Sequence, residues 1–366
     1  MFRLRPGTVK EIIRGREELE EALVLVENRE EKALNYPCLT GNLSPGDEVI
    51  LNTSALHLGL GTGGKHFVFF NFRYPQRDMR GKGHIMKLRY TPYQLKVFSC
   101  EEQESPFNNC FHEFNGLEGT PVLIGELHSM LIPAAAVIKY LCPHIRIGYI
   151  MTDGASLPLA VSETVSQLKN LGIITGTVTP GHAFGGELEA VNNYSALIAA
   201  REIFKSQVII VTMGPGTVGT GTEYGFTGLE QGELINAVNI LEGDPFLILR
   251  ASFQDARQRH WGISHHSLTV LEKIALTPAT LCLPLIEEEK LKYLKSQLEE
   301  RKIYSRHQVK EREGGVVKEA MDYFRLEGRT MGRSINEDKM FFETVGAAAR
   351  LVSEKFLFQE TGTPLC

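Results

Sequence analysis

The stretch TVTPGHAFGGELEAVN at residues 177–192 places a histidine and two glutamates among turn-forming residues. A plain connection between two elements needs turn residues such as Pro180 and Gly181, but it needs neither a histidine nor carboxylates. Because an imidazole titrates near neutral pH, His182 could act as a general base, or it could only bond a backbone carbonyl. We predict that His182 is catalytic and that Glu187 contacts a substrate.

Residues 250–266, RASFQDARQRHWGISHH, form the segment richest in arginine and histidine. Arginines offer forked donors to anionic oxygens, and a helix starting near the two adjacent histidines would favour an anion at its N-terminus. Since neighbouring helical residues point about 100° apart, only one of His265 and His266 is expected to face a site. We predict that His265 is catalytic. The predicted substrate contacts are Arg250, Arg257 and His266, with a solvated basic loop as the alternative.

Residues 214–228, GPGTVGTGTEYGFTG, form a loop rich in glycine and threonine. Its backbone N–H groups are unshielded by side chains and could cradle a phosphate or carboxylate, although a flexible lid is the alternative. The glycines fit the dinucleotide-binding spacing, but no helix follows at once and the next strand ends in Arg250 rather than in an acid. No lysine follows them, which excludes a Walker-type P-loop. The predicted substrate contacts are Gly214, Gly216, Gly219, Thr220 and Thr222.

Asp153 follows another apolar run and could orient a histidine or bind a metal, whereas capping of the next turn is the rival interpretation. We predict that Asp153 is catalytic. The suitable ligands for zinc, manganese or iron are His128, Asp153, His182 and one of His265 or His266. No H-E-x-x-H motif supports such a centre, so the metal and any cofactor stay unknown.

These polar groups follow a series of short, nearly all-apolar runs, which is typical of strands buried on both faces. The runs lie at residues 121–127, 145–151, 172–178, 207–213, 245–251 and 280–284. Helical patterns separate most of them, including one with Ser162 at its N-cap, so the order indicates a parallel sheet covered by helices. Ligands of such sheets bind outside the carboxyl ends of the strands, where we expect the polar loops to converge.

The first ~115 residues carry β-branched and aromatic runs between turn signals, which indicates a small barrel or sandwich. The predicted fold class is α/β, a doubly wound, mostly parallel sheet preceded by a small β-rich, barrel-like domain. The predicted domains are residues 1–115 and 116–366, the second ending in a helical extension. Ser334 and Glu337 form a capping-box pattern before that extension.

Composition narrows the classes of partner. The chain has 366 residues and a formal net charge of −5, so neither nucleic acid nor an anionic membrane is an expected partner. No apolar run approaches the ~20 residues of a membrane-spanning helix. The six cysteines form no C-x-x-C pair and are expected to be reduced thiols in a cytoplasmic protein. A homodimer is expected only from its general frequency among proteins.

Four segments, GELHSM, TVTPGHAFGGELEAVN, GPGTVGTGT and SHHSLT, resemble an uncharacterised bacterial family of domains of unknown function, the one numbered 3866. The resemblance extends over nearly the whole chain, including LSPGDEVILNTSA and HLGLGTGGKHFV near its start. It implies a bacterial intracellular protein, and it supplies no activity and no catalytic residue.

The residues therefore favour a cytoplasmic enzyme that acts by transfer or hydrolysis on a small anionic metabolite, bearing phosphate or carboxylate, at the carboxyl edge of the sheet. The first alternative is a non-catalytic small-ligand sensor or binding module. The second is a metal-dependent hydrolase.

Overall fold

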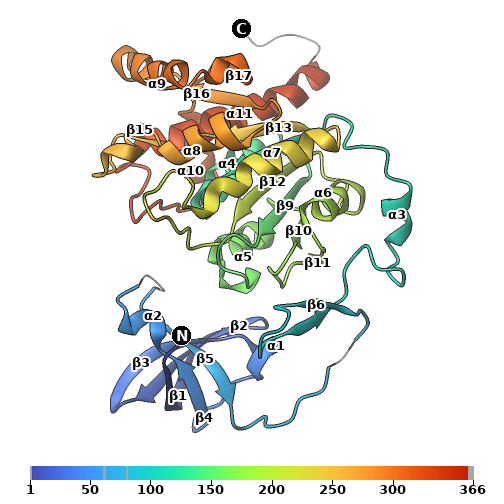
Figure 1. The fold of residues 1–366 in the computed structure, drawn as a ribbon, viewed down its shortest axis with the longest axis vertical. Coiled ribbons are helices and arrows are strands. Elements are labelled where there is room, and N and C mark those ends of the chain that lie inside the picture. The colour runs from blue at the N-terminus through green and yellow to red at the C-terminus, as the bar shows by residue number, and fades with distance from the viewer. Residues whose placement is uncertain (1, 61–62, 80, 362–366) are drawn as a thin grey trace. The chain divides into compact units, whose positions relative to one another are not determined.

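The computed structural model describes residues 2–60, 63–79 and 81–361, and the chain falls into two compact units that divide between Phe98 and Ser99 (Figure 1). The predicted boundary near residue 115 lies later in the chain. The polar stretch at residues 100–110 belongs to the second unit, where Cys100 N donates to Glu189 O at 2.8 Å.

The first unit contains a closed barrel of strand order β1-β2-β3-β5-β4, as predicted. Strand β1 pairs with β4 through its first residues and with β2 through the rest, and two bulges bend it between these partners. Alternate side chains such as Val24 and Leu51 point inward and form the barrel core. The elements are β1 (Leu4–Arg16), β2 (Leu19–Val26), β3 (Arg29–Asn35), α1 (Pro37–Thr40), β4 (Glu48–Asn52), α2 (Ser54–His57), β5 (His66–Asn71), β6 (Ile85–Lys87) and β7 (Leu95–Val97).

The second unit is built on an eight-stranded, all-parallel sheet of order β11-β10-β9-β12-β8-β13-β16-β17. All six apolar runs form strands of this sheet. Strands β11 and β17 were not predicted, because one has two residues and the other is polar. The strands are β8 (Pro121–Gly125), β9 (Ile147–Thr152), β10 (Gly176–Thr179), β11 (Leu188–Glu189), β12 (Val208–Met213), β13 (Asp244–Ile248), β16 (Thr280–Pro284) and β17 (Gln308–Arg312).

Helices cover both faces of this sheet, which makes it doubly wound (Figure 1). One face packs against α4 (Leu131–Leu141), α5 (Glu163–Asn170), α10 (Val316–Tyr323) and α11 (Lys339–Thr361). The other packs against α6 (Asn193–Glu202), α7 (Glu230–Ile240), α8 (His265–Thr269) with the π-helix Val270–Ile274, and α9 (Glu288–Glu300). Smaller elements are α3 (Asn108–His112), the β14 (Ala251–Ser252) and β15 (Gly262–Ile263) hairpin, and 3₁₀ turns at His128–Met130, Leu159–Val161, Thr227–Leu229, Gln258–His260 and Ile303–Ser305.

Of the two helix caps predicted from the sequence, the structure shows one at the start of a helix and the other in a turn ahead of a helix. Ser162 caps α5 as predicted, since its Oγ accepts from Val165 N at 3.0 Å. Ser334 and Glu337 bond each other at 2.6 Å, but they close a turn just ahead of α11, which begins at Lys339.

No helix in the described ranges has the length and apolar character needed to cross a bilayer.

The connections leave the centre of the sheet in opposite directions. Strand β8 is followed by α4 on one face, whereas its neighbours β12 and β13 are followed by α7 and α8 on the other face. Loops that diverge between adjacent parallel strands make the point where such sheets bind ligands. The carboxyl ends of β12, β8 and β13 are therefore the place to look for a site.

Candidate functional site

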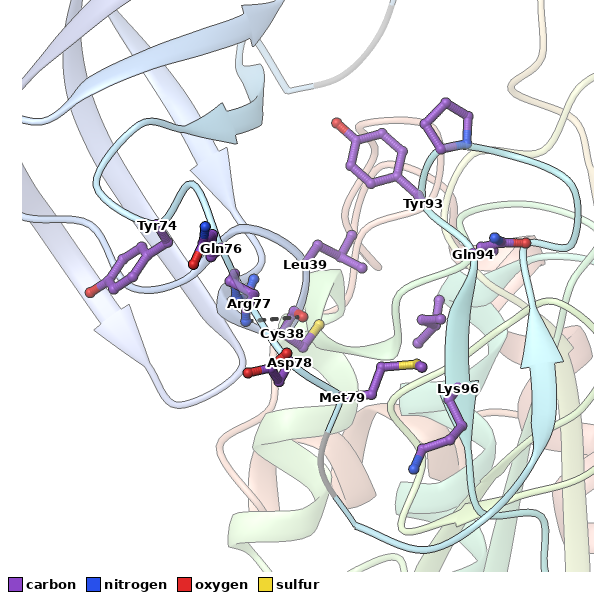
Figure 2. A pocket seen from close by; sticks show the side chains of 12 residues that line it. Cys38, Leu39, Tyr74, Gln76, Arg77, Asp78, Met79, Tyr93, Gln94 and Lys96 are labelled. Carbon is purple, nitrogen blue, oxygen red and sulfur yellow. Dashed lines mark hydrogen bonds between the residues drawn. The ribbon is translucent and has the colours of Figure 1, made fainter.

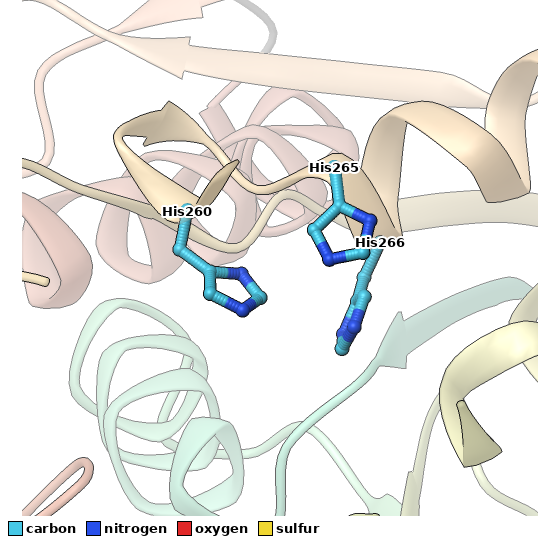
Figure 3. A group of neighbouring side chains, drawn as sticks. All are labelled: His260, His265 and His266. Carbon is cyan, nitrogen blue, oxygen red and sulfur yellow. The ribbon is translucent and has the colours of Figure 1, made fainter. Parts of the chain in front are cut away.

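Three histidines gather after the end of β13. His260 ends the 3₁₀ turn Gln258–His260, and His265 and His266 are the first two residues of α8. Their ring centroids lie 4.3–5.0 Å apart, and one possible ligand atom from each ring lies within 4.8 Å of the others (Figure 3). We call these residues the histidine cluster. Among the residues that the structure describes, it is the place where at least three potential metal-binding side chains meet.

A short hairpin brings His260 back toward the start of α8. Strands β14 and β15 pair, and Ser264 N then donates to Arg250 O at 2.8 Å. The Ser264 hydroxyl lies 2.7 Å from His260 Nδ1 and accepts from His266 N at 3.2 Å, so one side chain both caps α8 and holds a ring. From helix geometry, only one of His265 and His266 was expected to face a site. Their Cβ directions diverge, but both rings bend toward His260.

Burial keeps two rings of the cluster uncharged. Burial, and then the charges of Arg250 and Arg257, lower the pKa of His260 to about 3. Burial, followed by the neighbouring His266 and Arg259, lowers the pKa of His265 to about 4. Both rings are therefore neutral at pH 7, and each neutral ring keeps one nitrogen lone pair.

Glu126 lies behind the cluster and is fully buried. It follows β8 directly, and its Oε1 accepts from His266 Nδ1 at 2.5 Å and from Arg250 Nη1 at 3.1 Å. Burial alone would raise the pKa of this carboxyl, but the bond from His266 and the charge of Arg250 outweigh it and lower the pKa. Its second oxygen, Oε2, is buried and has no hydrogen-bond partner in the described structure.

Both predicted anion-binding arginines donate to carboxylates of the protein. Arg250 is only 7% exposed and pairs with Glu126. Arg257 is exposed, but its Nε and Nη2 donate to the two oxygens of Asp255 at 2.9 and 2.8 Å. Their forked donors are thus directed at internal partners, and their contact with a substrate stays a prediction.

The glycine–threonine loop lies over the cluster at two points. A Cβ added to Gly219 would lie 3.6 Å from His266 Nε2, and one added to Gly221 would lie 3.8 Å from the Arg259 guanidinium. Phe226, at the end of the same loop, stacks on His266 with ring centroids 3.8 Å apart and planes within 2°. The loop therefore brings bare backbone next to one histidine and one arginine.

The other predicted loop residues lie around these two points. Gly214 packs against Ser156 O, and Gly216 has a φ of +99°, which favours glycine. Thr220 Oγ1 and Thr222 Oγ1 bond each other at 2.9 Å. These threonines hold the turn, and a ligand contact from them stays a prediction.

His182, Asp153 and Glu187 lie at a different part of the edge. Asp153 Oδ2 accepts from the backbone N of His182 at 2.9 Å, so it caps the turn after β10. Glu187 pairs with Lys169 at 2.9 Å and accepts from Thr177 N at 3.0 Å. Strand β10 lies four strands from β13, about 19 Å at 4.8 Å per strand. The opening motif thus stabilises its own loop, and its catalytic role stays a prediction.

Glu230, the first residue of α7, lies beside the turn that Asp153 caps. Its Oε1 accepts a hydrogen bond from Thr152, and Gly154 lies close to its Oε2. Burial raises the pKa of Glu230 to about 7; the Thr152 bond opposes the shift and the charge of Asp153 adds to it. This side chain exchanges a proton near neutral pH.

The side chains that the sequence offered as ligands for one metal ion do not come together in the structure. His128 Nε2 lies 2.6 Å from Ser162 Oγ, and its Nδ1 lies 3.2 Å from Met213 O and from the Tyr149 hydroxyl. Both ring nitrogens of His128 are thus occupied inside the sheet edge, while Asp153 serves a turn. The histidines that do meet are His260, His265 and His266.

Sequence reasoning missed His260, Glu126 and Arg259 as site residues. Each lies in a segment that the patterns identified, and Glu126 directly follows the first buried strand. Their meeting depends on β8 lying next to β13, and the sequence does not show that order.

The first unit has a pocket of its own, with a volume of about 740 Å³ (Figure 2). Its cations already have partners: Arg77 Nη2 donates to Pro37 O at 3.0 Å and Lys96 Nζ donates to Gly81 O at 2.6 Å. The volume falls in the range of small-molecule sites. The lining side chains include Cys38, Leu39, Tyr74, Gln76, Arg77, Asp78, Met79, Tyr93 and Gln94.

Comparison with known families agrees with the resemblance seen in the sequence motifs. The family model described as "Protein of unknown function (DUF3866)" matches residues 32–349, nearly the whole chain. No curated protein matches the chain. The matched range includes the histidine cluster, Glu126 and the glycine–threonine loop.

Proposed function

We propose a function for this chain, which belongs to the DUF3866 family of proteins of unknown function. It is an enzyme that acts by transfer or hydrolysis on a small anionic metabolite at the carboxyl edge of the eight-stranded sheet. The observation that carries the proposal is the histidine cluster, backed by the buried Glu126 and situated where the loops after β8, β12 and β13 meet.

The anion is recognised by Arg259 and the glycine–threonine loop. Arg259 is exposed and forms no ion pair within the described residues, unlike Arg250 and Arg257. Its guanidinium lies beside Gly221, and the same loop passes over His266 at Gly219. An anion held by Arg259 would therefore lie between the loop and the cluster. Forked guanidinium donors match the oxygens of phosphate and carboxylate.

The imidazoles supply the reactive lone pairs. The ionised Glu126 can only accept hydrogen bonds, so His266 Nδ1 must be the donor of their 2.5 Å bond. A neutral His266 then has its free lone pair on Nε2, the atom that lies next to Gly219. Such a lone pair either takes a proton from a bound water or holds a metal ion that activates the water.

Thermal-shift screening tests this proposal with inorganic phosphate, sugar phosphates, nucleotides and small carboxylates. A compound that stabilises the wild-type chain should bind Arg259→Ala at least about tenfold more weakly, the loss of a charge-assisted hydrogen bond. Arg146→Ala is the matched control, because Arg146 is also exposed but precedes β9 at the opposite, amino edge. Equal binding by Arg259→Ala and wild type would reject this anion site. Turnover of the compound, lost in His265→Ala, would distinguish an enzyme from a sensor.

The pocket of the first unit supports a second candidate, a non-catalytic ligand-binding module (Figure 2). Its lining mixes aromatic, apolar and charged side chains, which suits a small organic ligand. In that case a stabilising compound would lose affinity in Tyr93→Ala and keep it in Arg259→Ala. The opposite pattern supports the site in the second unit.

A further inference from the structure

We propose that His260, His265 and His266 together bind one divalent metal ion of the zinc class. This inference deepens the proposed function and rests on it for a catalytic role, because it names what the three imidazoles hold. Metal binding can nevertheless be measured without any substrate.

The spacing of the rings suits a shared ion. One ligand atom from each ring lies within 4.8 Å of the other two. Zinc–nitrogen bonds of about 2.1 Å in a tetrahedral site place the nitrogens about 3.4 Å apart. Binding would thus draw the ligand nitrogens together by up to about 1.4 Å, a change that small side-chain rotations can provide. In Figure 3, His260 approaches from one side and the adjacent His265 and His266 from the other.

The neighbours of the rings match those of metal-binding histidines. Such a histidine usually gives its second ring N–H to a carboxylate or another acceptor, which fixes the ring and frees the ligand nitrogen. His266 does so through Nδ1 to Glu126, and His260 Nδ1 lies 2.7 Å from the Ser264 hydroxyl. In both rings the remaining nitrogen is Nε2. The cluster thus has two oriented ligands before any ion arrives.

Unsatisfied polar atoms give a second, independent indication. His265 Nε2 is buried and has no hydrogen-bond partner in the described structure, and the same is true of Glu126 Oε2. Buried polar atoms without partners are rare in native proteins and usually mark a missing water or ion. A metal bound to His265 would satisfy the first of these atoms.

The donor set selects the ion. Three imidazoles without thiolates favour zinc over calcium or magnesium, which prefer oxygen. Catalytic zinc sites have three protein ligands and leave a fourth position open. Arg259 and the loop at Gly219 and Gly221 lie beside the cluster, where they could contact a ligand at such an open position. A metal held there would lower the pKa of a bound water and supply hydroxide at neutral pH.

The experiment uses the full chain, stripped with a chelator and titrated with Zn²⁺ and with Co²⁺ as an optical probe. The wild type should bind about one equivalent, show visible cobalt absorption typical of imidazole ligands, and gain about 5–11 °C in Tm at a 100-fold excess over Kd. His260→Ala and His265→Ala should each weaken binding more than about 100-fold, since loss of a residue that only orients a metal ligand already costs about 10–100-fold. His144→Ala, at an exposed position before β9, should bind like wild type.

The variants keep the inference testable even if one fails to fold. His265 is only partly buried and accepts or donates no hydrogen bond through its Nε2, so His265→Ala should fold where His266→Ala does not. A folded wild type that binds neither ion overturns the inference, and so does unchanged binding in both His260→Ala and His265→Ala. If no ion binds while an Arg259-dependent anion still does, the metal site falls and the proposed function stands. If the ion binds and no anion does, the metal site stands and the proposed function falls.

Discussion

Replacing Glu126 by glutamine should destabilise the second unit strongly. The change keeps the shape of the side chain but removes the negative charge that faces Arg250 and His266, both less than 10% exposed. Removing one partner of a buried ion pair typically costs about 3–5 kcal/mol. We expect the lower end, about 3 kcal/mol, because Asp255 lies 3.9 Å from Arg250 and an amide oxygen can still accept one bond.

Urea unfolding followed by tryptophan fluorescence measures this loss. Trp261 is the single tryptophan of the chain and lies between His260 and Gly262, so its signal reports on the second unit alone. This matters because a chain of two units need not unfold in one step. A loss of about 3 kcal/mol corresponds to a fall in Tm of about 6–12 °C for a unit of this size.

The matched control for this charge removal is Glu288→Gln. Glu288 pairs with Lys292 at 2.7 Å, but both side chains are more than 70% exposed, so its loss should cost less than about 1 kcal/mol. The apolar double variant Glu126→Leu with Arg250→Met should be more stable than the sum of its single changes predicts, by about 0.5–3 kcal/mol. Glu126→Gln within about 1 kcal/mol of wild type, or additive single changes, would refute a coupled buried pair.

Three further predictions concern parts of the second unit away from the histidine cluster. Gly314→Ala should lower the free energy of unfolding, measured in urea, by several kcal/mol, because the added Cβ would lie 2.6 Å from the Glu343 carbonyl carbon in α11. Gly315→Ala is the control: its added Cβ would make only a 3.9 Å contact, so this change should be nearly neutral. Ser162→Ala should lower stability by at least about 1 kcal/mol, because it removes the N-cap of α5 and also the partner of His128 Nε2, and an unchanged Tm would contradict this. The pKa of Glu230 is raised to about 7, so its contribution to stability is complete below pH 4.5 and is lost as pH rises through 7. Glu230→Gln should abolish that loss, up to about 3 kcal/mol between pH 5 and pH 8, and parallel pH profiles would reject the shift.

Local patterns were enough to predict most elements of the fold. Continuous apolar runs predicted six of the eight strands of the sheet, because strands covered on both faces need no polar side. Ser162 was recognisable as a cap because its hydroxyl bonds an N–H only three residues away. Strands β11 and β17 escaped prediction because their pairing, rather than their own composition, makes them strands.

The candidate site was predictable only as a region. The segment at residues 250–266 was identified from its arginines and histidines, but the partners of those arginines depend on which strands are neighbours. Arg250 meets Glu126, 124 positions earlier in the chain, because β13 lies beside β8. Sequence spacing gives no sign of that contact, nor of the turn that folds His260 back onto His265.

The three nitrogen donors of the cluster all belong to seven consecutive residues, whereas the carboxylate behind His266 comes from 140 positions earlier. A synthetic peptide of those seven residues would therefore contain every proposed ligand and lack the group that orients one of them. Comparing the peptide with the intact protein would separate the affinity that short-range chain chemistry provides from the affinity that the assembled sheet adds.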